Sequence, residues 1–367
     1  MGKIDISHYI GCLIGGAVGD ALGAPIEFLS LSQIRAKFGK DGISDFIEFE
    51  NNTGAFTDDT QMTLFTAEAL LRAYHRAMLK GIGGALNTIA HHSYLRWLHT
   101  QNIGVNIDNI KDGKYDVEKG WLIKEKVLYN RRAPGNTCIS ALSSGIAGTI
   151  ENPINDSKGC GTIMRVAPVG LMFEGNNENA FKVASELSAI THGHPTGYLS
   201  AGFFASILSD LAIGIELRKS IDNAIQILEN WDNHSETKNA VNAAIDLFEK
   251  TKSQSDKISA ETIEKLGQGW IAEEALSMSL YASLIFERDY KNGILFSVNH
   301  SGDSDSTGSI TGNILGLING IDKIPVKWKD KLIGHEIVKQ VAEDLHIKMK
   351  GDSFNSNDEW WEKYPGF

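Results

Sequence analysis

Two short segments of the chain place paired aspartates among hydroxyl side chains. Residues 302–308 read Gly-Asp-Ser-Asp-Ser-Thr-Gly, and residues 56–60 read Phe-Thr-Asp-Asp-Thr. One Asp or Ser is enough to cap a helix, because its side-chain oxygen accepts the free N–H groups of the first turn. Two carboxylates with two hydroxyls provide several hard oxygen donors, and such a set suits a divalent cation.

An apolar, helix-like run follows each of these clusters, at residues 64–77 and 310–321. Helix capping explains either cluster taken alone. Four carboxylates brought together without a cation would repel one another and would be costly to remove from water. We therefore predict that the two clusters open two helices, meet in the core and share metal ions.

The composition restricts the classes of function. The chain has 367 residues, and its 35 Lys and Arg against 46 Asp and Glu give a net charge of −11. This balance argues against nucleic acid or an anionic membrane as the main partner, since both are bound through Lys and Arg. The cysteines, Cys12, Cys138 and Cys160, are widely spaced. They indicate neither a disulfide framework nor a zinc site, and they fit a reducing compartment.

The N-terminal region contains an apolar stretch but no secretion signal. The pattern of a basic segment, an apolar segment and a small-residue cleavage site is missing. Residues 10–26 include Asp20 and five glycines, which is typical of a packed helix rather than of a membrane span. We expect a cytoplasmic protein that does not bind membranes.

Strand signals are almost absent, and only residues 46–50 alternate weakly. We predict an all-α fold in a single compact multi-helix domain spanning 1–367, because a shared metal site would join both ends of the chain. Its motif core covers about 8–321, and 322–367 form a C-terminal helix and an aromatic, acidic tail that packs on its own protein. The helical spacing predicts helices over residues 57–80, 86–98, 120–129, 137–150, 178–190 and 272–286.

Two glycine-rich turns are candidates for anion binding. Gly135-Asn136-Thr137 opens a helix, where it is either a plain cap or a phosphate site made of backbone N–H groups. Residues 158–168 (Lys-Gly-Cys-Gly-Thr-Ile-Met-Arg-Val-Ala-Pro) offer the same cradle. Residues 191–198 contain His192-Gly193-His194, which lacks further ligands for a soft metal, so we interpret it as a polar loop that contacts a ligand.

Five motifs, taken in order, resemble those of the ADP-ribosylglycohydrolases. This family includes the dinitrogenase-reductase-activating glycohydrolase and the ADP-ribosylarginine hydrolases, and the resemblance covers roughly residues 8–321. The motifs are Gly-Asp-Ala-Leu-Gly at 19–23 with Glu27, Thr-Asp-Asp-Thr at 57–60, Gly-Cys-Gly-x-x-Met-Arg at 159–165, Thr-His-x-His-Pro-Thr-Gly-Tyr at 191–198 and Gly-Asp-Ser-Asp-Ser-Thr at 302–307.

The resemblance implies an all-α domain with two Mg²⁺ or Mn²⁺ ions in a central dinuclear cleft. The implied metal ligands are Thr57, Asp58, Asp59, Asp303, Asp305 and Ser306. Glu27 matches an acid beside the metals. The implied contacts to ADP-ribose are Gly135, Asn136 and Thr137 on one loop, Gly161, Thr162 and Met164 on the phosphate-holding turn, and His194 on the ribose or phosphate side.

The implied reaction is cleavage of the N-glycosidic bond between ribose and an arginine guanidinium, through a transition state with oxocarbenium character. Asp58 or Asp59 would orient or deprotonate the attacking water, and Glu27 would gate the site or position the substrate. The expected partners are an ADP-ribosylated protein, ADP-ribose as product and an ADP-ribosyltransferase toxin whose modification the enzyme reverses.

Ser306, together with the Gly-Cys-Gly and His-Pro-Thr-Gly-Tyr motifs, favours the arginine-specific branch. Many bacterial members have Asn at the position of Cys160. Two alternatives stay open: a hydrolase of serine-linked or O-acetyl-ADP-ribose, and a non-catalytic immunity protein that binds ADP-ribose or a toxin.

The shared-site hypothesis predicts that Asp303→Ala abolishes metal binding and activity but leaves the helical content unchanged. The aspartate cluster supplies ligands for the metal, whereas the apolar faces of the helices supply the folding energy. Titration calorimetry with Mg²⁺ or Mn²⁺, circular dichroism and an activity assay together test this. Wild-type turnover by the variant would refute a site shared by the two clusters.

Overall fold

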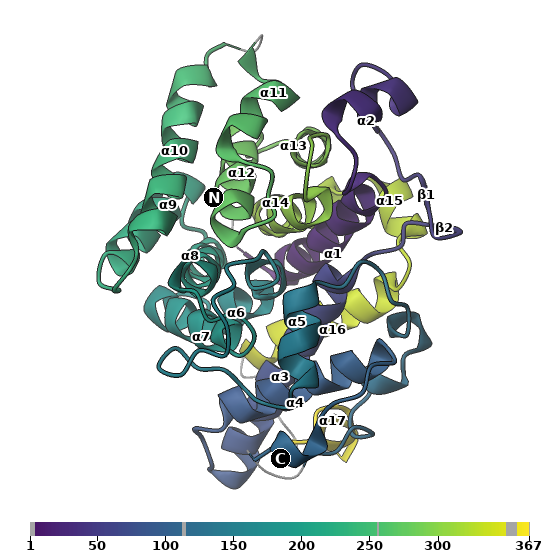
Figure 1. Cartoon of the computed structure of the whole chain (residues 1–367), viewed down its shortest axis with the longest axis vertical. Helices are drawn as coiled ribbons and strands as arrows, with labels where there is room; N and C mark the ends of the chain where they lie inside the picture. Colours follow the sequence, from purple (N-terminus) through teal and green to yellow (C-terminus); the bar gives the residue numbers. More distant parts are fainter. Residues whose placement is uncertain (1–3, 112–114, 255–256, 350–357, 367) are drawn as a thin grey trace.

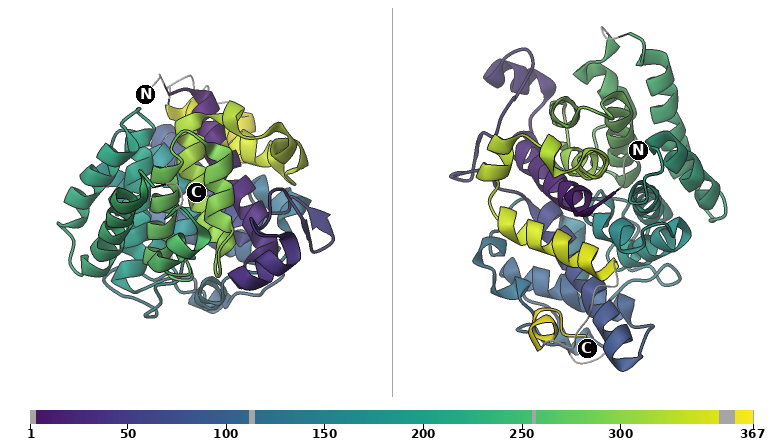
Figure 2. Two further views of the ribbon diagram at one scale, coloured as in Figure 1. Left: turned by 90° about the horizontal axis from the view of Figure 1, so that it is seen from above. Right: turned by 180° about the vertical axis from the view of Figure 1, so that it is seen from behind.

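Two helices from opposite ends of the chain pack backbone to backbone in the interior. They are α1 (Ile6–Gly23) and α14 (Ser304–Asn319), which run antiparallel and side by side (Figures 1 and 2). A glycine recurs at every fourth position of both helices, and the facing pairs are Gly11 with Gly316, Gly15 with Gly312, and Gly19 with Gly308. A β-carbon at any of these glycines would lie under 3.0 Å from the backbone of the opposite helix. The contact therefore requires glycine on both sides.

This contact brings the C-terminal end of α1 to the N-terminal end of α14, where Gly23 packs against the backbone of Ser304. A short 3₁₀ helix, η1 (Ala24–Ile26), follows α1 and leads to Glu27. The long helix α3 (Asp58–Lys80) begins at the same place, because Asp20 of α1 accepts a hydrogen bond from the backbone N–H of Thr57 (2.8 Å). Three element ends thus meet at one point.

The computed structural model describes residues 4–111, 115–254, 257–349 and 358–366, and it is helical, as predicted. Paired strands in these ranges are limited to β1 (Glu48–Phe49) and β2 (Asn52–Thr53), which are antiparallel with Glu48 opposite Thr53. The other α-helices are α2 (Leu31–Phe38), α4 (Leu86–Thr100), α5 (Asn136–Ser143), α6 (Ala167–Met172), α7 (Asn177–Ala189), α8 (Pro195–Leu211), α9 (Leu217–Leu228), α10 (Ser235–Thr251), α11 (Ala260–Ile263), α12 (Ala272–Ile285), α13 (Tyr290–Val298), α15 (Val326–Lys331), α16 (His335–Met349) and α17 (Asp358–Lys363).

Two predicted helices differ in the structure. Residues 120–129 form two 3₁₀ helices, η3 (Leu122–Lys124) and η4 (Lys126–Leu128), because Glu125 between them has extended backbone angles (φ −81°, ψ 106°). The helix predicted to reach residue 150 ends at Ser143. Gly145 follows with φ +72°, a left-handed conformation that stops the helix, and a β-carbon there would contact the backbone of Asn106.

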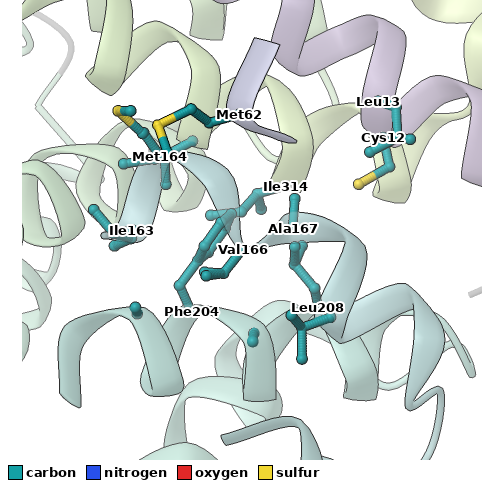
Figure 3. Close-up of a cluster of buried hydrophobic side chains, with 14 of the residues drawn as sticks. Cys12, Leu13, Met62, Ile163, Met164, Val166, Ala167, Phe204, Leu208 and Ile314 are labelled. Atoms are coloured by element: carbon teal, nitrogen blue, oxygen red, sulfur yellow. The ribbon is translucent and has the colours of Figure 1, made fainter. Parts of the chain in front are cut away.

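One continuous hydrophobic core joins the helices that surround the α1–α14 pair. Met62 of α3, Met164 of η5 (Ile163–Arg165), Phe204 of α8 and Ile314 of α14 are buried together in it (Figure 3). The core therefore holds α3 and η5, whose neighbouring residues line the site described below, in one packed unit with α14.

The first helix and the C-terminal tail both pack on the protein. Residues Ile6–Ile26 are apolar and long enough to cross a membrane, but 94% of their most apolar window is buried inside the protein. In the tail, the buried Tyr364 accepts a hydrogen bond at its carbonyl oxygen from Nδ1 of His75 on α3 (2.8 Å). The ring of Trp360 lies against His75 at a centroid distance of 5.6 Å.

The glycine contact predicts that Gly312→Ala destabilises the protein by about 2 kcal/mol, even though alanine favours helices, because the added methyl group meets the backbone of Gly15. Chemical denaturation followed by circular dichroism measures this. The matched control is Gly83→Ala, where a β-carbon meets nothing within 4 Å and the expected change stays within about 0.5 kcal/mol. Equal effects of the two substitutions would contradict a steric role for Gly312.

Candidate functional site

Five acidic side chains line one cavity of about 310 Å³. Glu27, Asp303 and Asp305 each place a carboxylate oxygen within 4.8 Å of the others, and Asp58 and Asp59 line the same cavity. All five are at least 94% buried. The two aspartate clusters, which lie more than 240 residues apart in the chain, thus reach a single site.

Helix caps hold these carboxylates in place. Thr57 caps α3 and accepts a hydrogen bond from the N–H of Asp59 (3.4 Å), while its hydroxyl oxygen lies 3.2 Å from a carboxylate oxygen of Asp305. Asp303 caps α14 and accepts from the N–H of Ser306 (3.2 Å). For Asp303 the capping and metal-binding interpretations are compatible, because a carboxylate oxygen that accepts one hydrogen bond keeps a second lone pair for a cation.

Asp20 is a further buried acid beside the cluster, and the sequence motifs predicted no separate role for it. One carboxylate oxygen accepts from the N–H and hydroxyl of Thr57 (2.8 and 2.9 Å), and the other accepts from the N–H and hydroxyl of Thr60 (3.0 and 2.5 Å). Asp20 therefore joins α1 to the first turn of α3. The sequence signal for this role is a lone acid inside an apolar, glycine-rich helix.

The acids raise one another's pKa values. Burial, and then the charge of Asp305, raises the pKa of Asp20 to about 7. Burial, followed by the charges of Asp305 and Asp303, raises the pKa of Glu27 to about 11. The pKa values of Asp58, Asp59 and Asp305 lie well above the ordinary aspartate value, and burial is the main cause for each. Positive charge placed among these carboxyl groups would therefore stabilise their ionised forms.

The donor set fits hard divalent cations. Oε2 of Glu27 and Oδ2 of Asp59 are buried and have no hydrogen-bond partner among the described residues. An unpaired buried carboxylate oxygen is costly, and coordination to a cation removes that cost. No Lys or Arg is among the described residues that line the cavity. Carboxylate and hydroxyl oxygens suit Mg²⁺ or Mn²⁺ better than softer metals.

Two glycine-containing turns form the second part of the cavity wall. Gly135, Asn136 and Thr137 line it from the N-terminus of α5, and the N–H of Gly135 donates to Asp58 (3.2 Å). Gly161 and Met164 line it from the turn before and within η5. A helix N-terminus favours negative charge, so this side suits phosphate oxygens.

Two of the residues predicted to contact ADP-ribose are not among those that line the cavity. The hydroxyl of Thr162 is buried and donates to the carbonyl oxygen of Gly197 (2.9 Å). His194 caps α8, where its Nδ1 accepts from the N–H of Thr196 (3.2 Å). The structure gives both residues a role in holding loops together.

His192 lines the cavity instead, as does Cys160. Burial, and secondarily the charge of Arg165, lowers the pKa of His192 to about 3, so its ring is neutral at physiological pH. The Cys160 thiol donates to Oδ2 of Asp303 (2.8 Å), and burial together with Asp303 raises its pKa well above the ordinary value. The thiol therefore stays protonated and is a poor nucleophile.

The chain belongs to the ADP-ribosylglycohydrolase family, whose model matches residues 1–354. It is 25% identical to the ADP-ribosylarginine hydrolase Tri1 of Serratia proteamaculans. The alignment spans 353 residues and covers 94% of this chain and 80% of the relative. It is 23% identical to the ADP-ribosyl-[dinitrogen reductase] glycohydrolase of Rhodospirillum rubrum. The alignment spans 341 residues and covers 90% of this chain and 93% of the relative.

A solved structure, described as an ADP-ribosylglycohydrolase-related protein complex, has the same fold. It superposes with a TM-score of 0.61 at 21% sequence identity and covers 93% of this chain and 97% of that chain. The family resemblance that the motifs suggested is confirmed, and the protein is a member of a family of glycohydrolases.

The crowded carboxylates predict that Asp59→Asn is more stable than the wild type in EDTA and gains less from Mg²⁺. Because the pKa of Asp59 is raised in the folded protein, its ionisation opposes folding once the pH exceeds the ordinary aspartate value of about 4. The advantage of the variant in EDTA should therefore be absent at pH 3 and reach about 2 °C in melting temperature at neutral pH.

Thermal unfolding from pH 3 to 8, with EDTA and with Mg²⁺, tests this expectation. Met78→Ala is a suitable control, because Met78 lies near the other end of α3, about 30 Å away, and its side chain is 59% exposed. A variant that is less stable than the wild type in EDTA at neutral pH would contradict mutual repulsion among the acids.

Proposed function

We propose that this protein is a metal-dependent hydrolase that removes ADP-ribose from ADP-ribosylated arginine on proteins. The observation that carries the proposal is the meeting of Glu27 and both aspartate clusters in one cavity, beside the phosphate-compatible loops, in a chain of this family. Two relatives that align with nine-tenths or more of the chain support it by their names, one an ADP-ribosylarginine hydrolase and the other a glycohydrolase of ADP-ribosylated dinitrogen reductase.

The predicted site residues divide into two groups with separate tasks, and all of those named below except Thr57 line the cavity. Thr57, Asp58, Asp59, Asp303, Asp305 and Ser306 would hold two Mg²⁺ or Mn²⁺ ions. Those ions would supply the positive charge that binds the ribose hydroxyls and makes a nearby water more acidic. Gly135 to Thr137, with Gly161 and Met164, would face the pyrophosphate, whose binding energy fixes the position of the distal bond.

The reaction is a hydrolysis that needs no redox partner. A water oxygen forms a bond to the anomeric carbon C1″ of the ribose, and the bond from C1″ to the guanidinium nitrogen breaks. The electron pair of that bond stays on the nitrogen. One proton of the water is taken up by the carboxylate of Asp58 or Asp59 and is then returned to the leaving nitrogen, so the products are ADP-ribose and arginine. Glu27, which has a carboxylate oxygen within 4.8 Å of Asp303 and Asp305, would position the substrate.

The substrate of this reaction is the product of an arginine-specific ADP-ribosyltransferase. Such a transferase, including one that acts as a toxin, is therefore the class of enzyme whose modification this protein would reverse.

The proposal predicts that the purified protein releases ADP-ribose from an ADP-ribosylarginine protein in Mg²⁺ or Mn²⁺ and releases none in EDTA. Both behaviours follow from the need of the acid cluster for a cation. Chromatographic detection of free ADP-ribose measures the release. Parallel reactions contain serine-linked ADP-ribose and O-acetyl-ADP-ribose as controls for the leaving group.

Release from serine-linked or O-acetyl substrate alone would keep the metal chemistry but overturn the arginine assignment. If no substrate is cleaved while Mg²⁺ still raises the melting temperature, the protein instead binds ADP-ribose or a toxin without catalysis.

A further inference from the structure

Two aromatic side chains stand at the opening of the acidic cavity. Phe28, directly after Glu27, and Trp270, just before α12, both line the cavity. Their rings are stacked, with centroids 5.6 Å apart and planes at 21°. Phe28 is 72% exposed and Trp270 is 37% exposed, although aromatic side chains of this size are normally among the more buried residues. Their position on the rim gives an incoming protein substrate direct access to both rings.

The backbone of Trp270 is held firmly in place. Its carbonyl oxygen accepts from the N–H of Cys160 (3.2 Å), and the next residue forms an isolated bridge with Gly159. Gly269, with φ +85°, lies against Asp303, where a β-carbon would come 3.2 Å from Cβ of that aspartate. Trp270 is therefore tied to both the glycine-rich turn and the metal-binding cluster.

Phe28 is held in a similar way. It follows η1 in a turn closed by a hydrogen bond from the N–H of Leu29 to the carbonyl oxygen of Ile26 (2.9 Å). Ser30 then caps α2 through a capping box with Gln33. Both rings are thus presented from ordered backbone at the cavity that holds the acidic cluster. Such preorganisation lowers the entropic cost of binding.

The charge of the cavity indicates which ligand suits this opening. Glu27 and four aspartates line the cavity together. Lys and Arg are absent from the described lining residues, and His192 is neutral. A lining with five carboxyl groups and no Lys or Arg favours a cation over an anion at the opening of the cavity. A neutral or anionic group placed there gains nothing from it.

We propose that Phe28 and Trp270 form the subsite for the leaving group and select the planar cationic guanidinium of a target arginine. This inference rests on the proposed function and extends it to the choice of substrate. A guanidinium that carries a ribose keeps its flat, delocalised charge and stacks favourably on an aromatic face. A serine hydroxyl and an acetyl group carry no positive charge, so they gain no cation–π attraction from the pair.

The test compares aromatic with aliphatic residues at the two positions. Phe28→Leu and Trp270→Leu, alone and combined, remove the π faces but keep apolar bulk. Phe28→Tyr and Trp270→Phe keep the π faces. We expect kcat/KM for an ADP-ribosylarginine peptide to fall about three- to tenfold in each leucine variant and at least about tenfold in the double variant. The aromatic variants should stay within about twofold of the wild type.

The second measurement is the affinity for free ADP-ribose by titration calorimetry in Mg²⁺, because ADP-ribose lacks the guanidinium. We expect its Kd to change less than about twofold in every variant. An equal loss of affinity for ADP-ribose and for the peptide would overturn the proposal and show that the rings stack on adenine or hold the loops. An unchanged kcat/KM in the double leucine variant would also overturn it.

The design separates failure of this inference from failure of the proposed function. Wild-type turnover of the peptide reports on the function. The ratio of peptide affinity to ADP-ribose affinity, compared between variants, reports on the subsite even if turnover is absent. Met78→Ala again serves as the control for removing an exposed apolar side chain far from the cavity.

Discussion

The contact between α1 and α14 is made by two helix backbones, and the geometry of the site depends on it. Because Gly15 and Gly312, with the pairs on either side of them, have no side chains, the helices approach more closely than ordinary packing allows. A single antiparallel register satisfies all these pairs at once. That register sets the end of α1 beside the start of α14, so Glu27 reaches Asp303 and Asp305. A bulkier side chain in the contact would separate the acids along with the helices.

Helix ends then concentrate the charge that the contact brings together. Thr57 and Asp303 cap α3 and α14, and Asp20 connects the first turn of α3 to α1 through four hydrogen bonds. The positive ends of the helix dipoles and the donated hydrogen bonds partly offset the burial of so many carboxylates. They do not offset it fully, since the pKa values of Glu27, Asp20 and Asp59 remain raised. The cluster therefore costs folding stability, and a bound cation would offset this cost.

The cavity separates chemistry from recognition. Its carboxylates suit the cations and the water, and the helix N-terminus at Gly135 suits phosphate, so this part fits any substrate that ends in ADP-ribose. The leaving group lies outside this shared portion. In the proposed subsite, the stacked rings of Phe28 and Trp270 contact that group from the opening of the cavity. Members of a fold family can differ in the side chains at the opening of the cavity and still keep the carboxylates inside it, because the two parts are built from different side chains on the same backbone.

Local sequence by itself determined the all-α character, the starts of the helices at Thr57 and Asp303 and the hard-oxygen chemistry of the clusters. Each of these depends on neighbours within a few residues, such as a capping oxygen followed by an apolar run. Only the tertiary structure decided which side chains share the cavity. It placed His192 in the lining where His194 caps a helix, turned Thr162 toward Gly197, and brought Phe28 against Trp270. These outcomes depend on the direction of a side chain from a loop and on the register between segments far apart in the chain, and neither is encoded in local spacing.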